Sequence, residues 1–312
     1  LPGKEKTKKQ PLLGKIKLSK AVAEVPFEEY DKVIVSQGGW KDVVHGPFKN
    51  LFTRLNNYVL VYHNYNVQEN FSPRKLSLLK QWAEKATKNL GATLKIFQAL
   101  EEIHKVNIPR QERLFNPLTI DRPETITPFP PPANEKYLFA VLAALDIERK
   151  AQDILIISLS NQAWKDRNWE LHLYGEGKDK SFLQKLTNRL KLQDKIFIHG
   201  NAKNYKEAIC QSHLVLQMTH IDAMPITVIE AMAMARPLVV SSVGDMPLWV
   251  KENDNGWVID NVSLENVHAG MEKAWAQRQD WESMGKRSFE FFRENFPASP
   301  VEYFLQQTGI IH

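Results

Sequence analysis

Short apolar runs bounded by polar turns alternate with longer stretches in which apolar residues recur three and four positions apart. Runs of the first kind are typical of buried strands, and the second spacing is typical of one face of a helix. In the first third of the chain this pattern predicts helices at 73–90 and around 100–104, and strands at 32–36, 58–62, 93–97 and 113–115. Strands separated by helix-length segments indicate an α/β fold with a parallel, doubly wound sheet.

The second half repeats the alternation more regularly. Strands are expected at 137–142, 169–174, 195–199, 213–217, 237–241 and 256–259. Helices are expected at 151–159, 180–190, 206–210, 227–235 and 267–277. Six strands with right-handed crossovers predict a complete Rossmann-like domain. Two Phe-containing helices follow, at 288–296 and 301–307, and we expect them to pack back on the first domain.

Six of the seventeen prolines lie between residues 116 and 136, where no packed element can be built on such a composition. We therefore expect a domain boundary there. The expected parts are a basic arm (1–20), a partial N-terminal Rossmann-like domain (21–116), a Pro-rich linker (117–136), a C-terminal Rossmann-like domain (137–287) and C-terminal helices (288–312). The first domain has about four strands and lacks a Gly-rich strand–turn–helix. Either the chain is truncated at its start or the protein lacks that part.

Composition and charge narrow the class further. With 43% hydrophobic and 25% charged residues, the composition is that of an ordinary globular protein, and the single Cys210 excludes an internal disulfide and fits a reducing, cytoplasmic compartment. No apolar run approaches the roughly 20 residues that span a bilayer. Seven lysines fall within residues 1–20, which either lie on the inner face of an anionic membrane or form a solvated arm. We expect no nucleic-acid binding, because no aromatic residue interleaves with these lysines.

The stretch from His220 to Pro237 combines a polar loop, a helix and two acids, Asp222 and Glu230. The first N–H groups of a helix point outwards without partners, so such a helix start suits an anion. A carboxylate one turn further in can accept two hydrogen bonds from a sugar diol. Taken alone, Glu230 fits a solvated helix face better than a binding site, but its place within Ala-Met-Ala and eight residues after Asp222 favours binding. Thr227 is first expected to cap this helix and only second to contact a phosphate.

Six stretches together resemble retaining GT-B glycosyltransferases of family 4, the glycosyl transferases group 1. They are Leu142 to Leu155, Trp169 to Gly177, Phe197 to Gly200, Asp222 to Pro237, Ser242 to Pro247 and Asn253 to Gly256. The resemblance runs from about Asp31 to Phe296 and is strong only after Tyr137. It implies a GT-B architecture with two Rossmann-like domains, the first incomplete, in which the second domain holds the donor and the first the acceptor.

The resemblance also implies roles for individual residues. Lys150 matches the family's diphosphate lysine, Asp222 the acid that contacts the donor sugar, and Glu230 the acid that takes the ribose hydroxyls. Donor contacts are expected from Gly175, Gly177, His199, Gly200, Met224, Pro225, Ile226 and Thr227. On the acceptor or donor-sugar side we expect Gly38, Gly39, His63 and Asn66. His63 is an equally good candidate for a structural histidine, and the two glycines for a simple turn.

Two departures from the family pattern bear on catalysis. Ala144 stands where the family carries its diphosphate arginine, and losing one such cation typically costs about 10²–10³ in rate. Asp222 is one methylene shorter than the usual Glu. The chain has no Asp-x-Asp pair, so we expect neither a metal-bridged diphosphate nor a cofactor. Lys150 and the helix N-terminus would then stabilise the diphosphate.

These observations predict a hexosyltransferase of polysaccharide biosynthesis. The resemblance implies that it moves a hexose from a nucleotide-diphosphate sugar, such as a UDP-sugar, to a sugar or lipid-linked acceptor, with retention and without a metal. A non-catalytic nucleotide-sugar-binding homologue is the first alternative, because Ala144 and the short first domain favour it. A GT-B epimerase acting on the nucleotide-sugar itself is the second.

Overall fold

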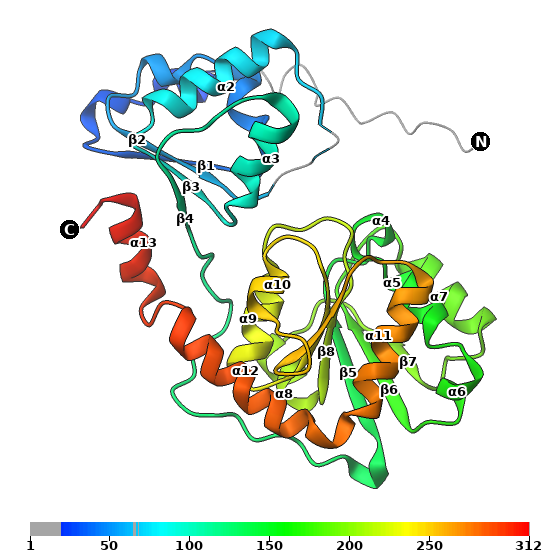
Figure 1. Ribbon diagram of the computed structural model, residues 1–312. Helices are drawn as coiled ribbons and strands as arrows, with labels where there is room; N and C mark the ends of the chain where they lie inside the picture. Colours follow the sequence, from blue (N-terminus) through cyan, green and yellow to red (C-terminus); the bar gives the residue numbers. More distant parts are fainter. Residues whose placement is uncertain (1–19, 65–66, 68, 312) are drawn as a thin grey trace, which may run out of the picture. The chain divides into compact units, whose positions relative to one another are not determined.

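A computed structural model describes residues 20–64, 67 and 69–311. Most of the basic arm, for which the sequence leaves membrane contact and a solvated arm as alternatives, lies outside these residues, and so does Asn66. The chain forms two compact units (Figure 1). The first comprises Leu1–Leu114 and Leu305–His312, and the second comprises Phe115–Phe304. Within the described part of the chain, no helix is long and apolar enough to cross a bilayer.

The first unit is built on a four-stranded parallel sheet in the order β1-β2-β3-β4. The strands are β1 (Val33–Gln37), β2 (Tyr58–Tyr62), β3 (Lys88–Gly91) and β4 (Gln111–Arg113). Helix α2 (Pro73–Lys85) joins β2 to β3, and α3 (Lys95–His104) joins β3 to β4. Short 3-10 turns fill the chain between β1 and β2. Trp40, Phe52, Tyr62, Trp82 and Phe97 form the centre of the core that these elements enclose.

The expected strand at 93–97 is wrong, because β3 lies five residues earlier and α3 already begins at Lys95. The Thr93 hydroxyl accepts a hydrogen bond from the Lys95 N–H at 3.1 Å, which starts the helix at this point. Ile96, Phe97 and Leu100 are then fully buried on one helical face. The β-branched and aromatic character of this stretch favours a strand locally, and burial of the helical face overrides that preference.

The second unit contains a six-stranded parallel sheet in the order β10-β9-β8-β5-β6-β7. Its strands are β5 (Tyr137–Leu142), β6 (Trp169–Tyr174), β7 (Ile196–Ile198), β8 (Leu214–Gln217), β9 (Leu238–Ser241) and β10 (Gly256–Ile259). The order reverses between β5 and β8, which makes this the switch point of a doubly wound sheet. The expected α/β class with two Rossmann-like parallel sheets is therefore confirmed.

Helices cover both faces of this second sheet (Figure 1). They are α4 (Ile147–Lys150), α5 (Gln152–Ser158), α6 (Gln162–Lys165), α7 (Lys180–Arg189), α8 (Tyr205–Gln211), α9 (Ile226–Ala233), α10 (Met246–Trp249), α11 (Leu264–Ala276) and α12 (Trp281–Asn295). The last helix, α13 (Pro300–Thr308), follows α12 and is not one of them. Phe139 and Val141 of β5 belong to one core cluster, whereas Ala140 and Leu142 belong to the other. Successive side chains of a strand point to opposite faces, so β5 is buried on both sides.

The Pro-rich segment at 115–136, which we call the strap, belongs to the second unit and packs on the rest of it at several points. Phe115, Leu118 and Ile120 pack on the cluster formed with α9 and α12. Further along, the fully buried Arg236 donates to the Pro128 carbonyl at 2.9 Å. Burial lowers the pKa of Arg236 to about 10, and its guanidinium is held by backbone carbonyls. The segment that the sequence suggested as a linker is thus attached along one unit.

The C-terminal helices divide between the two units. Helix α12 packs against α9 in the second unit, whereas residues 305–312 group with the first. There, the Lys32 ammonium donates to the carbonyls of Thr308 and Gly309 at 3.0 and 2.7 Å. A cation near the last carbonyls of a helix is favourable, because the C-terminal end of a helix carries partial negative charge.

Candidate functional site

A cavity of about 330 Å³ opens beside the switch point of the second sheet. It lies at the carboxyl ends of β5 and β6 and at the start of α9. Its lining is formed by Thr119, Leu142, Ala143, Ala144, Tyr174, Gly175, Glu176, Asn201, Tyr205, Ile226, Thr227 and Glu230. Doubly wound sheets bind ligands in this position, outside the carboxyl ends of the strands. Four of the residues expected to bind a donor, Gly175, Ile226, Thr227 and Glu230, therefore share one cavity.

Glu230 is the acid of this cavity, and its side chain is only 3% exposed. Its Oε1 accepts two hydrogen bonds from the strap, from the Thr119 N–H at 2.7 Å and from the Thr119 hydroxyl at 2.5 Å. Among the described residues, no donor contacts Oε2. Because a carboxylate oxygen accepts about two hydrogen bonds, the strap fills Oε1 and leaves the acceptor capacity of Oε2 for a ligand.

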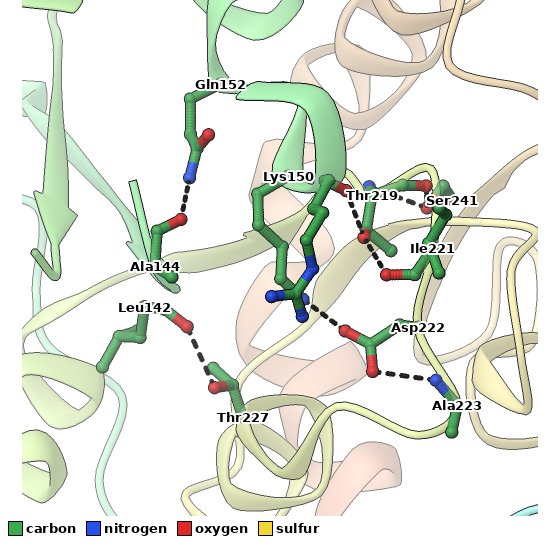
Figure 2. A network of polar contacts seen from close by, with 11 residues as sticks. Leu142, Ala144, Lys150, Gln152, Thr219, Ile221, Asp222, Ala223, Thr227 and Ser241 are labelled. Carbon is green, nitrogen blue, oxygen red and sulfur yellow. Dashed lines mark hydrogen bonds and ion pairs between the residues drawn. The ribbon is translucent and has the colours of Figure 1, made fainter. Parts of the chain in front are cut away.

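The start of α9 offers backbone donors to the same cavity. Pro225 precedes the helix, and Ile226 and Thr227 are its first two residues, so their N–H groups have no helical partner. The expectation that the Thr227 side chain caps the helix is wrong. Its hydroxyl donates instead to the Leu142 carbonyl at 3.1 Å, at the end of β5 (Figure 2). This bond attaches the helix start to the strand beside it.

Lys150 and Asp222 form an ion pair in the loop next to the cavity. Figure 2 shows the Lys150 ammonium directed at Oδ2 of Asp222, while Oδ1 accepts the Ala223 N–H at 2.9 Å. Their side chains are 10% and 16% exposed. The Thr219 hydroxyl holds the loop to the end of α4 by donating to the Arg149 carbonyl at 2.6 Å. The two residues expected to contact diphosphate and donor sugar thus contact each other.

The Gly-x-Gly turn after β6 packs against the loop that follows β5. Gly175 has φ +152°, and a Cβ there would lie 2.1 Å from the Ala143 carbonyl oxygen. A Cβ at Gly177 would lie 2.2 Å from the Leu145 oxygen. Only glycine allows this close approach, so both residues shape the turn. Gly177 is absent from the cavity lining, and Gly175 contributes to it.

The β5–α4 loop carries Ala144, the position at which the resemblance leads us to expect a diphosphate arginine. Gln152 Nε2 donates to the Ala144 carbonyl at 2.7 Å and fixes the loop (Figure 2). The side chain of Ala144 is exposed and carries no charge. Arg149 is also exposed, and within the described part of the chain its guanidinium has no hydrogen-bond or ion-pair partner. One unpaired cation therefore lies next in sequence to Lys150.

His199 lies outside the cavity, in a ring stack on β6 and β7. Its ring is parallel to that of Tyr174 at a centroid distance of 4.6 Å, and its Nε2 lies 3.0 Å from His172 Nδ1. Burial lowers the pKa of both His172 and His199, which favours neutral rings at pH 7. Tyr174 connects the stack to the cavity, because it lines both. Gly200 lies against the carboxylate of Glu176, another lining residue.

The candidate residues of the first unit follow β1 and β2. The N–H groups of Gly38 and Gly39 both donate to Oδ2 of Asp42, at 2.8 and 3.3 Å. Nε2 of His63 lies 2.9 Å from the Ser36 hydroxyl. Gly38 and Gly39 are therefore part of a side-chain-stabilised turn. No group of three or more His, Cys, Asp or Glu residues that could hold a metal ion occurs among the described residues.

Several lining residues were not predicted from the sequence. Thr119 lies in a Pro-rich stretch that signals only the lack of regular structure, and it is 111 residues from Glu230. Tyr174 and Glu176 flank Gly175, so their position next to the Gly-x-Gly turn could have identified them as lining residues. Asn201 and Tyr205 follow Gly200 at short distance and could have been found in the same way.

The family assignment rests on a match over more than half of the chain. Residues 124–291 match the family described as Glycosyl transferases group 1, and the chain belongs to this family. It is 25% identical over 122 residues to a poly(ribitol-phosphate) alpha-N-acetylglucosaminyltransferase of Staphylococcus aureus, and the aligned stretch covers 39% of this chain and 25% of that protein. It is 23% identical over 132 residues to an N-acetyl-alpha-D-glucosaminyl L-malate synthase of Bacillus anthracis, covering 42% and 35%. These alignments span only a quarter to about a third of the curated relatives.

Solved structures show the same fold at low sequence identity. Anabaena HepE in complex with UDP aligns with a TM-score of 0.72 at 16% identity, over 96% of this chain and 84% of that one. TarM of S. aureus in complex with UDP and other ligands aligns with a TM-score of 0.65 at 19% identity, over 83% and 53%. The fold is therefore of the GT-B glycosyltransferase type.

Proposed function

We propose that this chain transfers a hexose from a nucleotide-diphosphate sugar to a sugar or lipid-linked acceptor, with retention of configuration and without a metal. The observation that carries the proposal is the cavity at the switch point. It combines a buried carboxylate, Glu230, with the unpaired N–H groups of Ile226 and Thr227. A nucleoside diphosphate needs these two kinds of group, an acceptor pair for its ribose hydroxyls and donors for its phosphates.

The charges near the cavity suit a leaving diphosphate. Transfer breaks the bond between the anomeric carbon and the β-phosphate oxygen, so negative charge grows on the diphosphate and preorganised donors stabilise it. Lys150 can supply one positive charge when its ion pair with Asp222 opens. Asp222 is then available to accept hydrogen bonds from the donor sugar. Arg149, exposed and without a partner among the described residues, can supply part of the charge that Ala144 lacks.

Similar proteins suggest which donors to test first. HepE was solved with UDP, and the curated relatives are named for transfer of N-acetylglucosaminyl groups. UDP-glucose and UDP-N-acetylglucosamine are therefore the first donors. We further propose that the reaction takes place in the cytoplasm, with residues 1–20 on the inner membrane face, because this lysine-rich segment suits an anionic surface.

The second candidate function is nucleotide-sugar binding without turnover, and Ala144 is the specific observation that favours it. The experiment measures UDP release from each donor, with and without a panel of sugar and lipid-linked acceptors, for the unaltered chain and for Ala144→Arg. Acceptor-dependent UDP release by the unaltered chain supports the transferase. Release only by Ala144→Arg supports a binding protein. A donor epimer formed without acceptor would indicate an epimerase and overturn the transfer proposal.

A further inference from the structure

We infer that Thr119 is a positioning residue for Glu230, and that the strap is thereby a built-in part of the nucleotide site. The inference rests on the proposed function, because it assigns Glu230 to the ribose. Thr119 orients the carboxylate by filling Oε1, so that Oε2 is the oxygen presented to the ribose hydroxyls.

Two donors on one oxygen define the orientation of the carboxylate. The N–H and the hydroxyl of Thr119 lie 2.7 and 2.5 Å from Oε1. Rotation of the carboxyl group would break both bonds and leave an unpaired oxygen in a side chain that is 3% exposed. Leaving a buried acceptor unpaired is costly, and more so when it is charged. The carboxylate is therefore fixed before a ligand arrives, which reduces the ordering required on binding.

Thr119 can hold this position because the strap is anchored on both sides of it. Leu118 and Ile120, its two neighbours, pack against the core cluster of the second unit. Beyond them, the Arg122 guanidinium lies 5.1 Å from the centre of the Phe292 ring and donates to the Arg293 carbonyl at 3.3 Å. The backbone of Thr119 is thus attached to the same core that carries α9.

The contact orients Glu230 and leaves the site open. Both Thr119 and Glu230 line the cavity, which keeps a volume of about 330 Å³ beside them. A blocking segment would fill that space or engage both carboxylate oxygens. Here only Oε1 is engaged among the described residues. The strap therefore acts as a fixed wall that supplies two donors.

The test measures nucleotide binding by calorimetry on the full chain and on Thr119→Val, Thr119→Ser and Thr127→Val. Valine removes the hydroxyl at nearly constant shape, and serine keeps it. Thr127 is the matched control, because its hydroxyl contacts the Met234 sulfur at 3.6 Å on the same strap. The probe is whichever of UDP, GDP and ADP binds the unaltered chain most tightly, together with its 2′-deoxy form. Melting temperatures of all variants report whether the fold is kept.

We expect Thr119→Val to weaken binding of the ribonucleotide about fivefold to tenfold, a part of the full value of a hydrogen bond to a charged group. Thr119→Ser and Thr127→Val should stay within about twofold of the unaltered chain. The loss should shrink for the 2′-deoxy nucleotide and vanish in a Glu230→Ala background, which leaves Thr119 no side-chain acceptor, as a coupled pair requires.

Equal binding by Thr119→Val would overturn the inference. Tighter binding would overturn it as well and would indicate that the contact blocks the site. A loss of the same size for the 2′-deoxy form and in the Glu230→Ala background would also overturn it, because it would reflect general loosening of the strap. If the unaltered chain binds none of the three nucleotides, the proposed function fails and this inference fails with it. Nucleotide binding that is insensitive to Thr119 overturns this inference alone.

Discussion

The ion pair between Lys150 and Asp222 can be tested by measuring the free energy of unfolding after Lys150 is replaced. Replacing Lys150 by Met removes the charge and keeps most of the packing volume. Asp222 is then left as a largely buried carboxylate, 16% exposed, without its cation. Breaking one partner of a buried pair typically costs about 3–5 kcal/mol. Because both side chains keep some exposure, we expect a loss near the lower limit, about 3 kcal/mol of unfolding free energy.

The assay is urea denaturation followed by intrinsic fluorescence. Six of the eight tryptophans lie in the second unit, so the signal reports mainly on the unit that contains the pair. Adding Asp222→Asn to Lys150→Met should recover most of the loss, because Asn leaves no unpaired charge. Lys286→Met is the control, since Lys286 pairs with Glu282 at about 50% exposure and should change stability by at most about 0.5 kcal/mol. A loss for Lys150→Met no larger than that of the control would refute the reasoning, as would a further loss on adding Asp222→Asn.

Three further predictions concern the turn, the pH dependence and the missing cation. Gly175→Ala should lower the unfolding free energy by about 2 kcal/mol or more in the same assay, because its Cβ would meet the Ala143 oxygen at 2.1 Å; an unchanged midpoint would contradict this close approach. Burial lowers the pKa of His213 from 6.5 to about 4, and its Nδ1 accepts a hydrogen bond from the Leu138 N–H. His213 therefore becomes protonated below pH 6.5 in the unfolded chain, but only below about pH 4 in the folded chain. The free energy of unfolding should therefore fall as the pH decreases through this window. Urea titrations at pH 7, 5.5 and 4.5 should show a smaller fall for His213→Gln than for the unaltered chain. Equal falls for the two proteins would show that His213 does not cause the pH dependence. Arg149→Ala should weaken UDP binding about tenfold and leave uridine binding unchanged, whereas equal losses for both ligands would exclude a contact with the diphosphate.

The strands of the second unit could be predicted because they are short and largely buried, with β8 and β9 buried at every position and β6 alternating between buried and half-buried residues. β5, β6 and β10 coincide with the ranges expected from the sequence, and the other three agree to within a residue at each end. Each is a short apolar run between clear turns, so no other element fits the same residues. The prediction for Thr93 to Phe97 is wrong because the stretch is short enough to be either element. Only its burial in the core, beside Tyr62 of β2, selects the helix.

The candidate site could be located from the sequence, and its contacts could not. Glu230 and Thr227 were identified through local spacing, which a motif preserves. The donors to Glu230 come from Thr119, 111 residues away in a stretch without periodicity. Lys150 and Asp222 were each assigned to a ligand atom, and their contact with each other depends on how two loops, 72 residues apart, meet at the end of the sheet. Such long-range pairings leave no trace in the local pattern.

The central claim is that the second unit binds a nucleoside diphosphate through Glu230. The most direct measurement is a calorimetric titration of the full chain and of Glu230→Ala with UDP, GDP and ADP. We expect saturable binding of at least one of them to the unaltered chain, and binding at least about tenfold weaker to Glu230→Ala, because hydrogen bonds to a charged acceptor are lost. Equal affinity of the two proteins, or no binding of any of the three nucleotides to the unaltered chain, would contradict it.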